Sequence, residues 1–129
     1  MVRMILAACR KSLLPLLLLA TAGLTFAADD EPVQTQAEMN QQAAADFEKA
    51  DAQLNKVYKQ VQAGLDAEGL AKLKVAQRAW LAFRDAEADF QADAEARGGT
   101  MAPCIYNGVR QQLTETRIAD LKALLQNHE

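Results

Sequence analysis

Apolar residues recur every three or four positions along almost the whole chain after residue 35, and this spacing constrains the fold most strongly. It places the apolar side chains on one side of an α-helix. The first stripe starts beside Thr35-Gln36-Ala37-Glu38, a capping-box sequence in which the Thr hydroxyl and the Glu carboxylate can each bind a backbone amide. The spacing predicts a first helix of about 30 residues. Its apolar stripe comprises Met39, Ala43, Phe47, Ala50, Leu54, Val57, Tyr58, Val61 and Leu65.

Two further stretches carry the same spacing and are separated by segments typical of turns. Asp66-Ala67-Glu68-Gly69 interrupts the first stripe, and Arg97-Gly98-Gly99 ends the second. Thr100 and Pro103 suit the start of a third helix. The second stripe comprises Leu70, Leu73, Ala76, Trp80, Phe83, Ala88, Phe90 and Ala94, and the third comprises Ile105, Tyr106, Val109, Leu113, Thr116, Leu121 and Leu124. No stretch alternates with a period of two, so the predicted fold is all-α: an antiparallel hairpin of two long helices plus a third helix, in a small helical bundle.

The first 27 residues have the composition of a secretory signal peptide. A basic start is followed by an apolar run over residues 12–27, and Thr25-Phe26-Ala27 places small residues at the −3 and −1 positions of a cleavage site. A transmembrane anchor is the alternative, but about 16 apolar residues interrupted by Pro15 fall short of the roughly 20 that span a bilayer. The predicted organisation is a signal peptide (1–27), a disordered leader (28–34) and a single helical domain (35–127).

The chain beyond residue 27 is acidic. All 17 Asp and Glu residues lie there, whereas three of the 14 Lys and Arg residues lie before it, so this part has a net charge of −6. Such a charge opposes binding to nucleic acid or to an anionic membrane and favours a cationic partner. The signal peptide predicts a periplasmic or secreted protein without a membrane anchor after cleavage.

The two cysteines have different predicted fates. Leu6-Ala7-Ala8-Cys9 is similar to a lipoprotein cleavage box, but the apolar run follows Cys9 rather than preceding it, so we interpret this match as chance. Removal of the signal peptide would leave Cys104 as the single cysteine of the mature chain. We expect Cys104 to be a packed thiol, with an intermolecular crosslink as the alternative.

The run AQRAWLAFRDAEADF, residues 76–90, combines the only Trp of the chain with charged residues at helical spacing. Trp80 lies at the centre of the second apolar stripe, which favours a core residue. Arg84 and Glu87 fall on the same side of the helix. Their positions around the helix therefore predict that these charged side chains point inward beside Trp80.

The third helix repeats this arrangement with Arg117 and Asp120 on its inward side. Arg remains charged, so an inward guanidinium needs a carboxylate. Because the second and third helices run antiparallel, Arg84 and Arg117 should lie at similar heights. The sequence thus predicts a structural network with crossed pairs, Arg84 with Asp120 and Glu87 with Arg117. A small-ligand site at the two arginines is the alternative.

The remaining acids of the second helix point to the opposite side. Asp85, Asp89 and Asp93 follow one another at four-residue spacing and are joined by Glu95. Like charges at this spacing weaken an isolated helix slightly. A solvated face is the ordinary explanation, and a docking face for a basic protein is the functional one.

Other chemistries find little support in the residues. The single His, His128, stands at the end of the chain, and no Glu-x-x-His pair or Cys/His set suits a metal. Ser12 is the only Ser, and it lies in the predicted signal peptide, so the mature chain offers no serine nucleophile. We predict no enzyme activity, no cofactor and no metal.

The chain resembles the LprI-type family of bacterial lysozyme inhibitors. The resemblance is carried by AQRAWLAFRDAE (76–87), with ADAQLNKVY (50–58) before it and LTETR (113–117) after it, and it covers roughly residues 36–125. It implies a small, exported, helical protein that inhibits lysozyme. Family members commonly carry Cys near three positions that are Gln42, Ala88 and Val109 here, so the family's disulfides are not implied for this chain.

These observations predict an exported, non-enzymatic binding protein that inhibits lysozyme. An acidic helical face would dock on the cationic enzyme and block its polysaccharide cleft. The candidate contacts are Asp85, Asp89 and Asp93, with Arg78 at the rim. The alternative is an envelope structural or adaptor protein that self-associates through its nearly heptad stripes or through Cys104.

Overall fold

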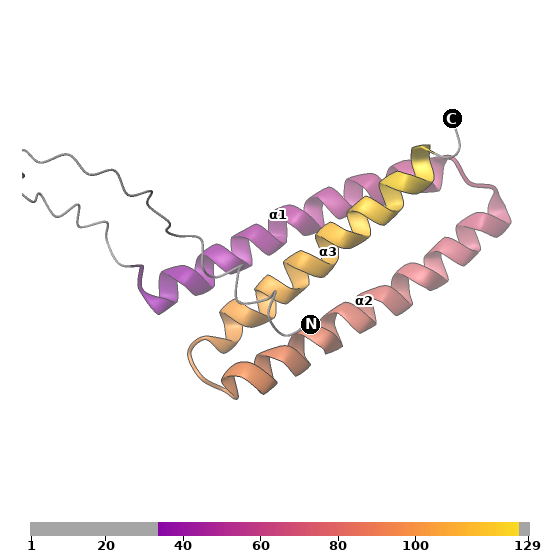
Figure 1. The fold of residues 1–129 in the computed structure, drawn as a ribbon. Helices are drawn as coiled ribbons and strands as arrows, with labels where there is room; N and C mark the ends of the chain where they lie inside the picture. The colour runs from indigo at the N-terminus through magenta and orange to yellow at the C-terminus, as the bar shows by residue number, and fades with distance from the viewer. Residues whose placement is uncertain (1–33, 127–129) are drawn as a thin grey trace, which may run out of the picture.

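A computed structural model describes residues 34–126, which form three α-helices (Figure 1). α1 spans Gln36–Ala63, α2 spans Ala67–Ala96 and α3 spans Ala102–Gln126. This part of the chain contains no strand, so the predicted all-α class is confirmed. The predicted signal peptide, residues 1–27, and all of the leader except Gln34 lie outside the described residues.

The residues at the helix starts explain where α1 and α2 begin. The Glu38 amide donates to Thr35 Oγ1 at 3.2 Å, and the Thr35 amide donates to Glu38 Oε2 at 2.7 Å, so the predicted capping box is confirmed. The Thr35 amide, and then its hydroxyl, lower the pKa of the Glu38 carboxyl below its ordinary value by binding the charged form. Asp66 accepts a hydrogen bond from the Gly69 amide at 2.8 Å. The predicted turn at 66–69 is therefore the cap and first turn of α2.

The chain reverses between α2 and α3 through two residues with positive φ. These are Arg97, at 26°, and Gly98, at 73°. A side chain rarely adopts the Gly98 conformation, which is why Gly suits the position just after a helix. Pro103 lies in the first turn of α3, where its missing N–H leaves no hydrogen bond unmade.

α3 is the central helix of the bundle. It packs along α1 and along α2, whereas α1 and α2 make few direct contacts with each other (Figure 1). The buried residues of α3 explain this position, because they face both neighbours. They are Cys104, Ile105, Gly108, Val109, Thr114, Ile118 and Leu121.

The apolar core divides into two clusters along the bundle. The first joins all three helices near the α1–α2 turn and comprises Leu54, Val57, Val61, Leu73, Ile118 and Leu121. The second joins α2 and α3 near their connection and comprises Ala88, Ala92, Ile105 and Val109. Its two alanines allow the backbones of α2 and α3 to approach closely. Charged and aromatic side chains lie in the interval between the clusters.

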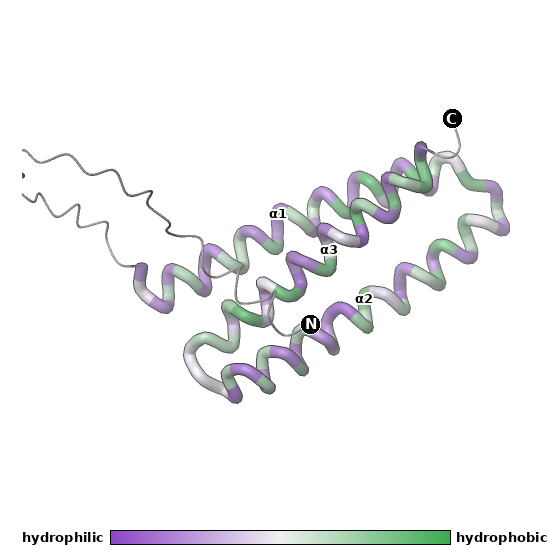
Figure 2. Tube along the Cα trace, viewed as in Figure 1, coloured by the Kyte–Doolittle hydropathy of each residue, from purple (hydrophilic) through white to green (hydrophobic). Residues whose placement is uncertain are grey.

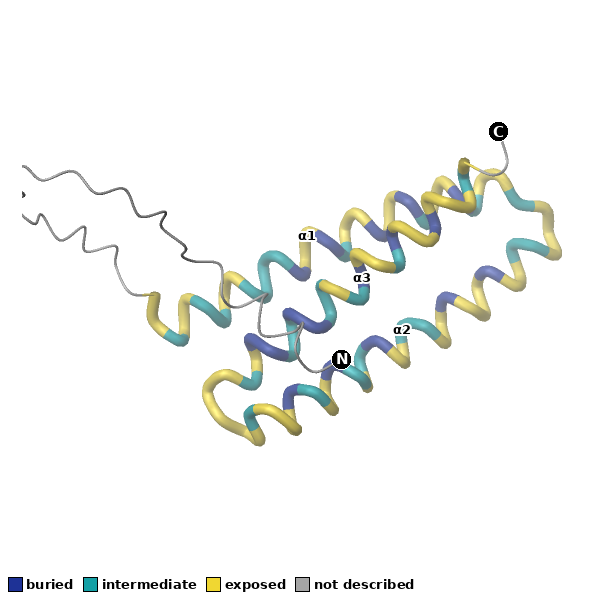
Figure 3. The backbone as a smooth tube through the Cα atoms, viewed as in Figure 1, coloured by how far each residue is buried: buried dark blue, intermediate teal, exposed yellow. Residues whose placement is uncertain are grey.

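The predicted apolar stripe of α2 is correct at Leu73 and Ala88, which are buried, and wrong at four other positions. Phe83 and Phe90 are 54% and 66% exposed, and Ala76 and Ala94 are also exposed. The buried residues of α2 are Leu73, Gln77, Arg84, Ala88 and Ala92. Apolar and polar residues alternate along this helix (Figure 2), and buried positions recur among exposed ones (Figure 3). Periodicity could not choose between the two sides.

The stripes of α1 and α3 need fewer corrections. Every residue of the predicted α1 stripe is buried or half-buried. In α3, Thr116 and Leu124 are exposed, and Thr114 and Ile118 are buried instead. The phase of α1 was clear because its opposite side carries polar residues almost throughout.

Candidate functional site: an arginine belt behind an acidic helix face

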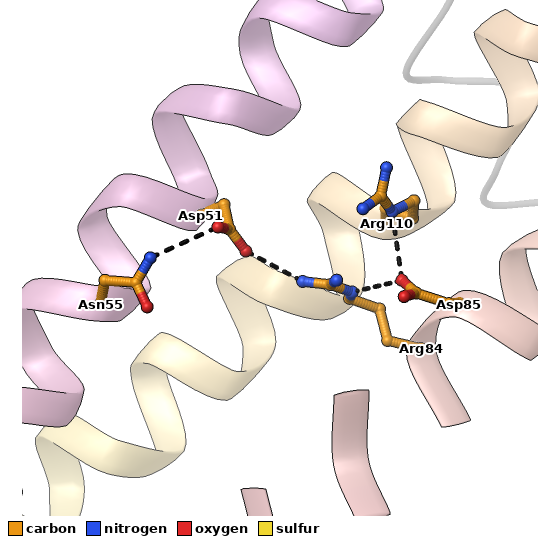
Figure 4. A network of polar contacts seen from close by, with 5 residues as sticks. All are labelled: Asp51, Asn55, Arg84, Asp85 and Arg110. Atoms are coloured by element: carbon orange, nitrogen blue, oxygen red, sulfur yellow. Dashed lines mark hydrogen bonds and ion pairs between the residues drawn. The ribbon is translucent and has the colours of Figure 1, made fainter. Parts of the chain in front are cut away.

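Three arginines and three aromatic rings form what we call the arginine belt: Arg84, Arg110, Arg117, Phe47, Trp80 and Tyr106. Arg84 is its centre and is only 4% exposed. Its Nη1 donates to Asp51 Oδ1 of α1 at 3.0 Å, and its Nε donates to Asp85 Oδ1 at 2.9 Å (Figure 4). Arg84 therefore ties α2 to α1 across a region where these helices otherwise make few contacts.

Asp85 serves two arginines from different helices. Its Oδ1 also accepts a hydrogen bond from Arg110 Nε of α3, at 3.2 Å (Figure 4). The sequence analysis placed Asp85 on the outer face, but the structure holds it between Arg84 and Arg110. That expectation is corrected, because a carboxylate at the edge of the helix interface is drawn to two guanidinium groups on one side.

The rings separate the guanidinium groups, so cations and aromatics alternate. The Arg84 Cζ lies 5.4 Å from the centre of the Trp80 ring and 5.1 Å from that of Phe47. Arg110 lies 3.7 Å from the Phe47 ring and 5.0 Å from the Tyr106 ring. Arg117 lies 5.8 Å from the Trp80 ring. Each such contact stabilises a cation by about 0.5–2 kcal/mol, which helps to explain how three arginines gather in a region where only Arg84 and Arg110 bind carboxylates.

The predicted crossed pairs do not form within residues 34–126. Arg84 binds Asp51 instead of Asp120, which is exposed. Arg117 Nε donates to the Gln77 amide oxygen at 3.2 Å, and Glu87 accepts from Gln91 Nε2 at 2.5 Å. Arg84 and Arg117 are thus offset along the bundle: Arg110, seven residues earlier in α3, stands at the level of Arg84.

The sequence analysis missed Arg110 of the belt and Asp51, which binds Arg84, although the position of Arg110 could have been noticed. Arg110 precedes Arg117 by seven residues, two helical turns, and therefore lies on the same side of α3. Asp51 lies beside the apolar stripe of α1, and its spacing from other residues did not indicate that it would bind an inward arginine. Trp80 is half-buried and packs against the first apolar cluster.

The outer side of α2 carries the remaining candidate contacts. Asp89 and Asp93 are exposed, and neither forms an ion pair with another described residue. Arg78 is exposed on the same helix. Of the three acids predicted for docking, the structure leaves Asp89 and Asp93 open to solvent and commits Asp85 to the belt.

No three potential metal ligands gather among residues 34–126. Polar residues line a hollow at the start of α1, from Gln34 to Ala45. None of the three helices combines the length and apolar character needed to cross a bilayer. Cys104 is buried and disulfide-bonded, which contradicts the expected packed thiol.

Comparisons with known proteins identify the family of this chain. The family model described as lysozyme inhibitor LprI matches residues 27–121. The chain is also 38% identical over 108 residues to an uncharacterized protein of Rhizobium meliloti (strain 1021), covering 74% of this chain and 77% of that protein. No solved structure matches it. The match spans all of α1 and α2 and most of α3, so the chain belongs to the LprI family of lysozyme inhibitors.

Proposed function

We propose that the protein is exported and inhibits lysozyme by binding it through the acidic outer face of α2. The observation that carries the proposal is the pair of exposed carboxylates, Asp89 and Asp93, which no described cation neutralises. Family membership supports the choice of lysozyme as the partner. The protein would act by blocking the cleft of lysozyme, and it would need no catalytic group or cofactor.

The position of these acids on the helix supports a binding role. Asp93 lies in the last turn of α2, which contains no basic residue. The C-terminal end of a helix carries a partial negative charge, so acids there oppose the helix dipole. Asp89 and Asp93 also repel each other at four-residue spacing. The two acids thus create a local negative potential that weakens α2. Such a potential fits a surface that attracts a cationic partner.

The chemistry of lysozyme explains how such a surface can inhibit. Lysozyme cleaves a polysaccharide between two carboxylates in a cleft, and lysozymes of the animal type are strongly cationic. Attraction between the acidic face and the basic rim of the cleft would speed encounter, and the bound helix would exclude the polysaccharide. Screening limits this attraction to about 8–10 Å at physiological salt, so inhibition should weaken as salt rises.

The arginine belt supplies the rigid support for this face. Arg84 and Asp85 are fixed to α1 and α3 on the inner side of α2, one turn before Asp89. Binding surfaces carried by fixed elements lose less conformational entropy on association. Asp85 therefore positions the face rather than contacting the partner.

The test is lysozyme turnover measured with the protein expressed from its full sequence, at low and at physiological salt. We expect inhibition that weakens with salt, and we expect Asp89→Lys with Asp93→Lys to reduce it at least tenfold by reversing the local charge. The matched control is Glu48→Lys with Asp120→Lys, which changes net charge equally on exposed positions of α1 and α3. Absence of inhibition at any stoichiometry, or equal loss in the control, would contradict the proposal.

A further inference from the structure

The outer side of α2 is apolar as well as acidic. Three large apolar residues are exposed there, Val75 at 68%, Phe83 at 54% and Phe90 at 66%. Exposed alanines fill the positions between them, at Ala79, Ala82 and Ala86. At 100° per residue these six residues fall within an arc of about 100°, and we call them the phenylalanine ridge. The ridge lies opposite the side of α2 that carries Arg84.

The ridge is unlike an ordinary surface because α2 buries polar side chains instead. Gln77 and Arg84 are 8% and 4% exposed, whereas the two phenylalanines of the same helix face solvent. Scattered apolar residues are normal on a surface, but a continuous apolar strip marks an interaction site. Phenylalanine is enriched at the centres of protein interfaces, where a buried ring contributes a large contact area.

The surrounding charges indicate which partner covers the ridge. Asp89 directly precedes Phe90, and Asp93 follows it by one helical turn, so the ridge has an acidic border at this end. A second copy packed parallel to the first would bring its own acidic border to the same place, and the whole sequence has a net charge of −3. Like charges across an interface oppose binding, and opposite charges favour it. A protein with basic residues around an apolar recess therefore complements this end of the ridge.

We infer that Phe83 and Phe90 are the main binding contacts for the cationic partner and insert into an apolar recess with a basic rim. This inference rests on the proposed function and names the residues that hold the complex together. The two acids and the two rings would contribute to binding in different ways. Asp89 and Asp93 raise the association rate through long-range attraction, whereas the two rings slow dissociation by excluding water from the contact.

The experiment measures association and dissociation rates on immobilised animal-type lysozyme at several salt concentrations. We expect Phe83→Ala with Phe90→Ala to speed dissociation at least tenfold, because each truncated central contact typically weakens binding about tenfold or more. Its association rate should keep the salt dependence of the unaltered protein. Asp89→Lys with Asp93→Lys should slow association and remove that dependence.

The matched control is Leu124→Ala, which removes an apolar side chain that is 44% exposed on α3. It should leave both rates unchanged. Thermal melting checks that the double phenylalanine variant folds, and sedimentation checks its oligomeric state. Both rings are largely exposed, so their removal should not lower the melting temperature.

Each outcome has a distinct meaning. Tight binding that is unchanged in the double phenylalanine variant overturns the inference and leaves the proposed function standing. No binding by the unaltered protein removes both. A dimer that Phe83→Ala with Phe90→Ala converts to a monomer, with lysozyme binding unchanged, also overturns the inference, because the ridge would then be a self-association surface.

Discussion

A single buried guanidinium organises the interior at the scale of residues. Arg84 meets one carboxylate from α1, one from its own helix and two aromatic rings, which together replace the water that it loses. Lys could not replace it, because an ammonium group lacks the planar fork that reaches two carboxylates at once. Arg84 thus has a structural role that depends on the planar shape of its guanidinium group as well as on its positive charge.

Replacing Arg84 with Ala should lower the free energy of unfolding by about 1–3 kcal/mol, because Asp51 loses its partner, Asp85 keeps only Arg110, and two rings lose a packed neighbour. Denaturation by urea measures this change. Arg78→Ala on the exposed side of α2 is the control and should shift stability by no more than about 0.5 kcal/mol. Equal effects of the two substitutions would show that the belt does not stabilise the fold.

Thr114 is the opposite case, a buried polar group that the interior does not satisfy. It is fully buried, and its Oγ1 has no hydrogen-bond partner. Thr114→Val keeps the shape and removes the hydroxyl, so it should raise the free energy of unfolding by about 1 kcal/mol or more. Thr116→Val is the control, because that exposed hydroxyl donates to the Gln112 carbonyl at 3.1 Å. A lower melting temperature for Thr114→Val would contradict this account.

A helical wheel could predict which residues point inward here, but it could not predict their partners. It placed Arg84 on the inner side of α2 correctly, because direction around a helix follows from sequence spacing. Partners depend on height along neighbouring helices, which is set by the connection at residues 97–101 and by packing. The crossed pairs with Asp120 and Glu87 were wrong for this reason.

At the scale of elements, the phase of each helix depends on the size of the side chains as well as on their polarity. α2 has apolar residues on both sides, and it buries Ala88 and Ala92 while it exposes Phe83 and Phe90. The alanines allow α2 to lie close to Ile105 and Val109 of α3. Hydrophobicity alone favours the phenylalanines for burial, so the sequence could not reveal this preference.

Enlarging a buried alanine should therefore disrupt the packing of α2 on α3. Ala88→Leu adds three carbon atoms where no side-chain surface is exposed, so it should lower the free energy of unfolding by about 1–3 kcal/mol. Ala86→Leu, on the exposed side of the same helix, should be nearly neutral. Chemical denaturation of both variants measures the difference. A larger loss for Ala86→Leu would mean that α2 is rotated relative to the structure.

At the scale of the whole molecule, the all-α fold class could be predicted from the sequence. The order in which the three helices pack against one another could not. Helical periodicity and capping residues were enough for three antiparallel helices, because these signals are local. That α3 would lie centrally followed from no local signal. It depends on α2 and α1 both presenting narrow faces to α3, and on Arg84 spanning the distance between them.

Asp93 is exposed in the last turn of α2, where its charge weakens the helix, so stability and binding should change in opposite directions when this charge is removed. Asp93→Asn removes a negative charge from the last turn of α2 at equal helix propensity, and it should raise the free energy of unfolding by about 0.3–1 kcal/mol. The same change should weaken lysozyme inhibition by reducing the local negative potential. Thermal melting and turnover assays at low salt measure both effects on one sample.

Glu68→Gln is the matched control, because Glu68 lies in the first turn of the same helix, where an acid is favourable. It should lower stability slightly and leave inhibition unchanged. The acids of α2 would then have separable effects: the one at the start stabilises the helix, and the one at the end attracts the partner. If Asp93→Asn lowers the melting temperature, or if inhibition survives it unaltered at low salt, Asp93 contributes to the fold rather than to recognition.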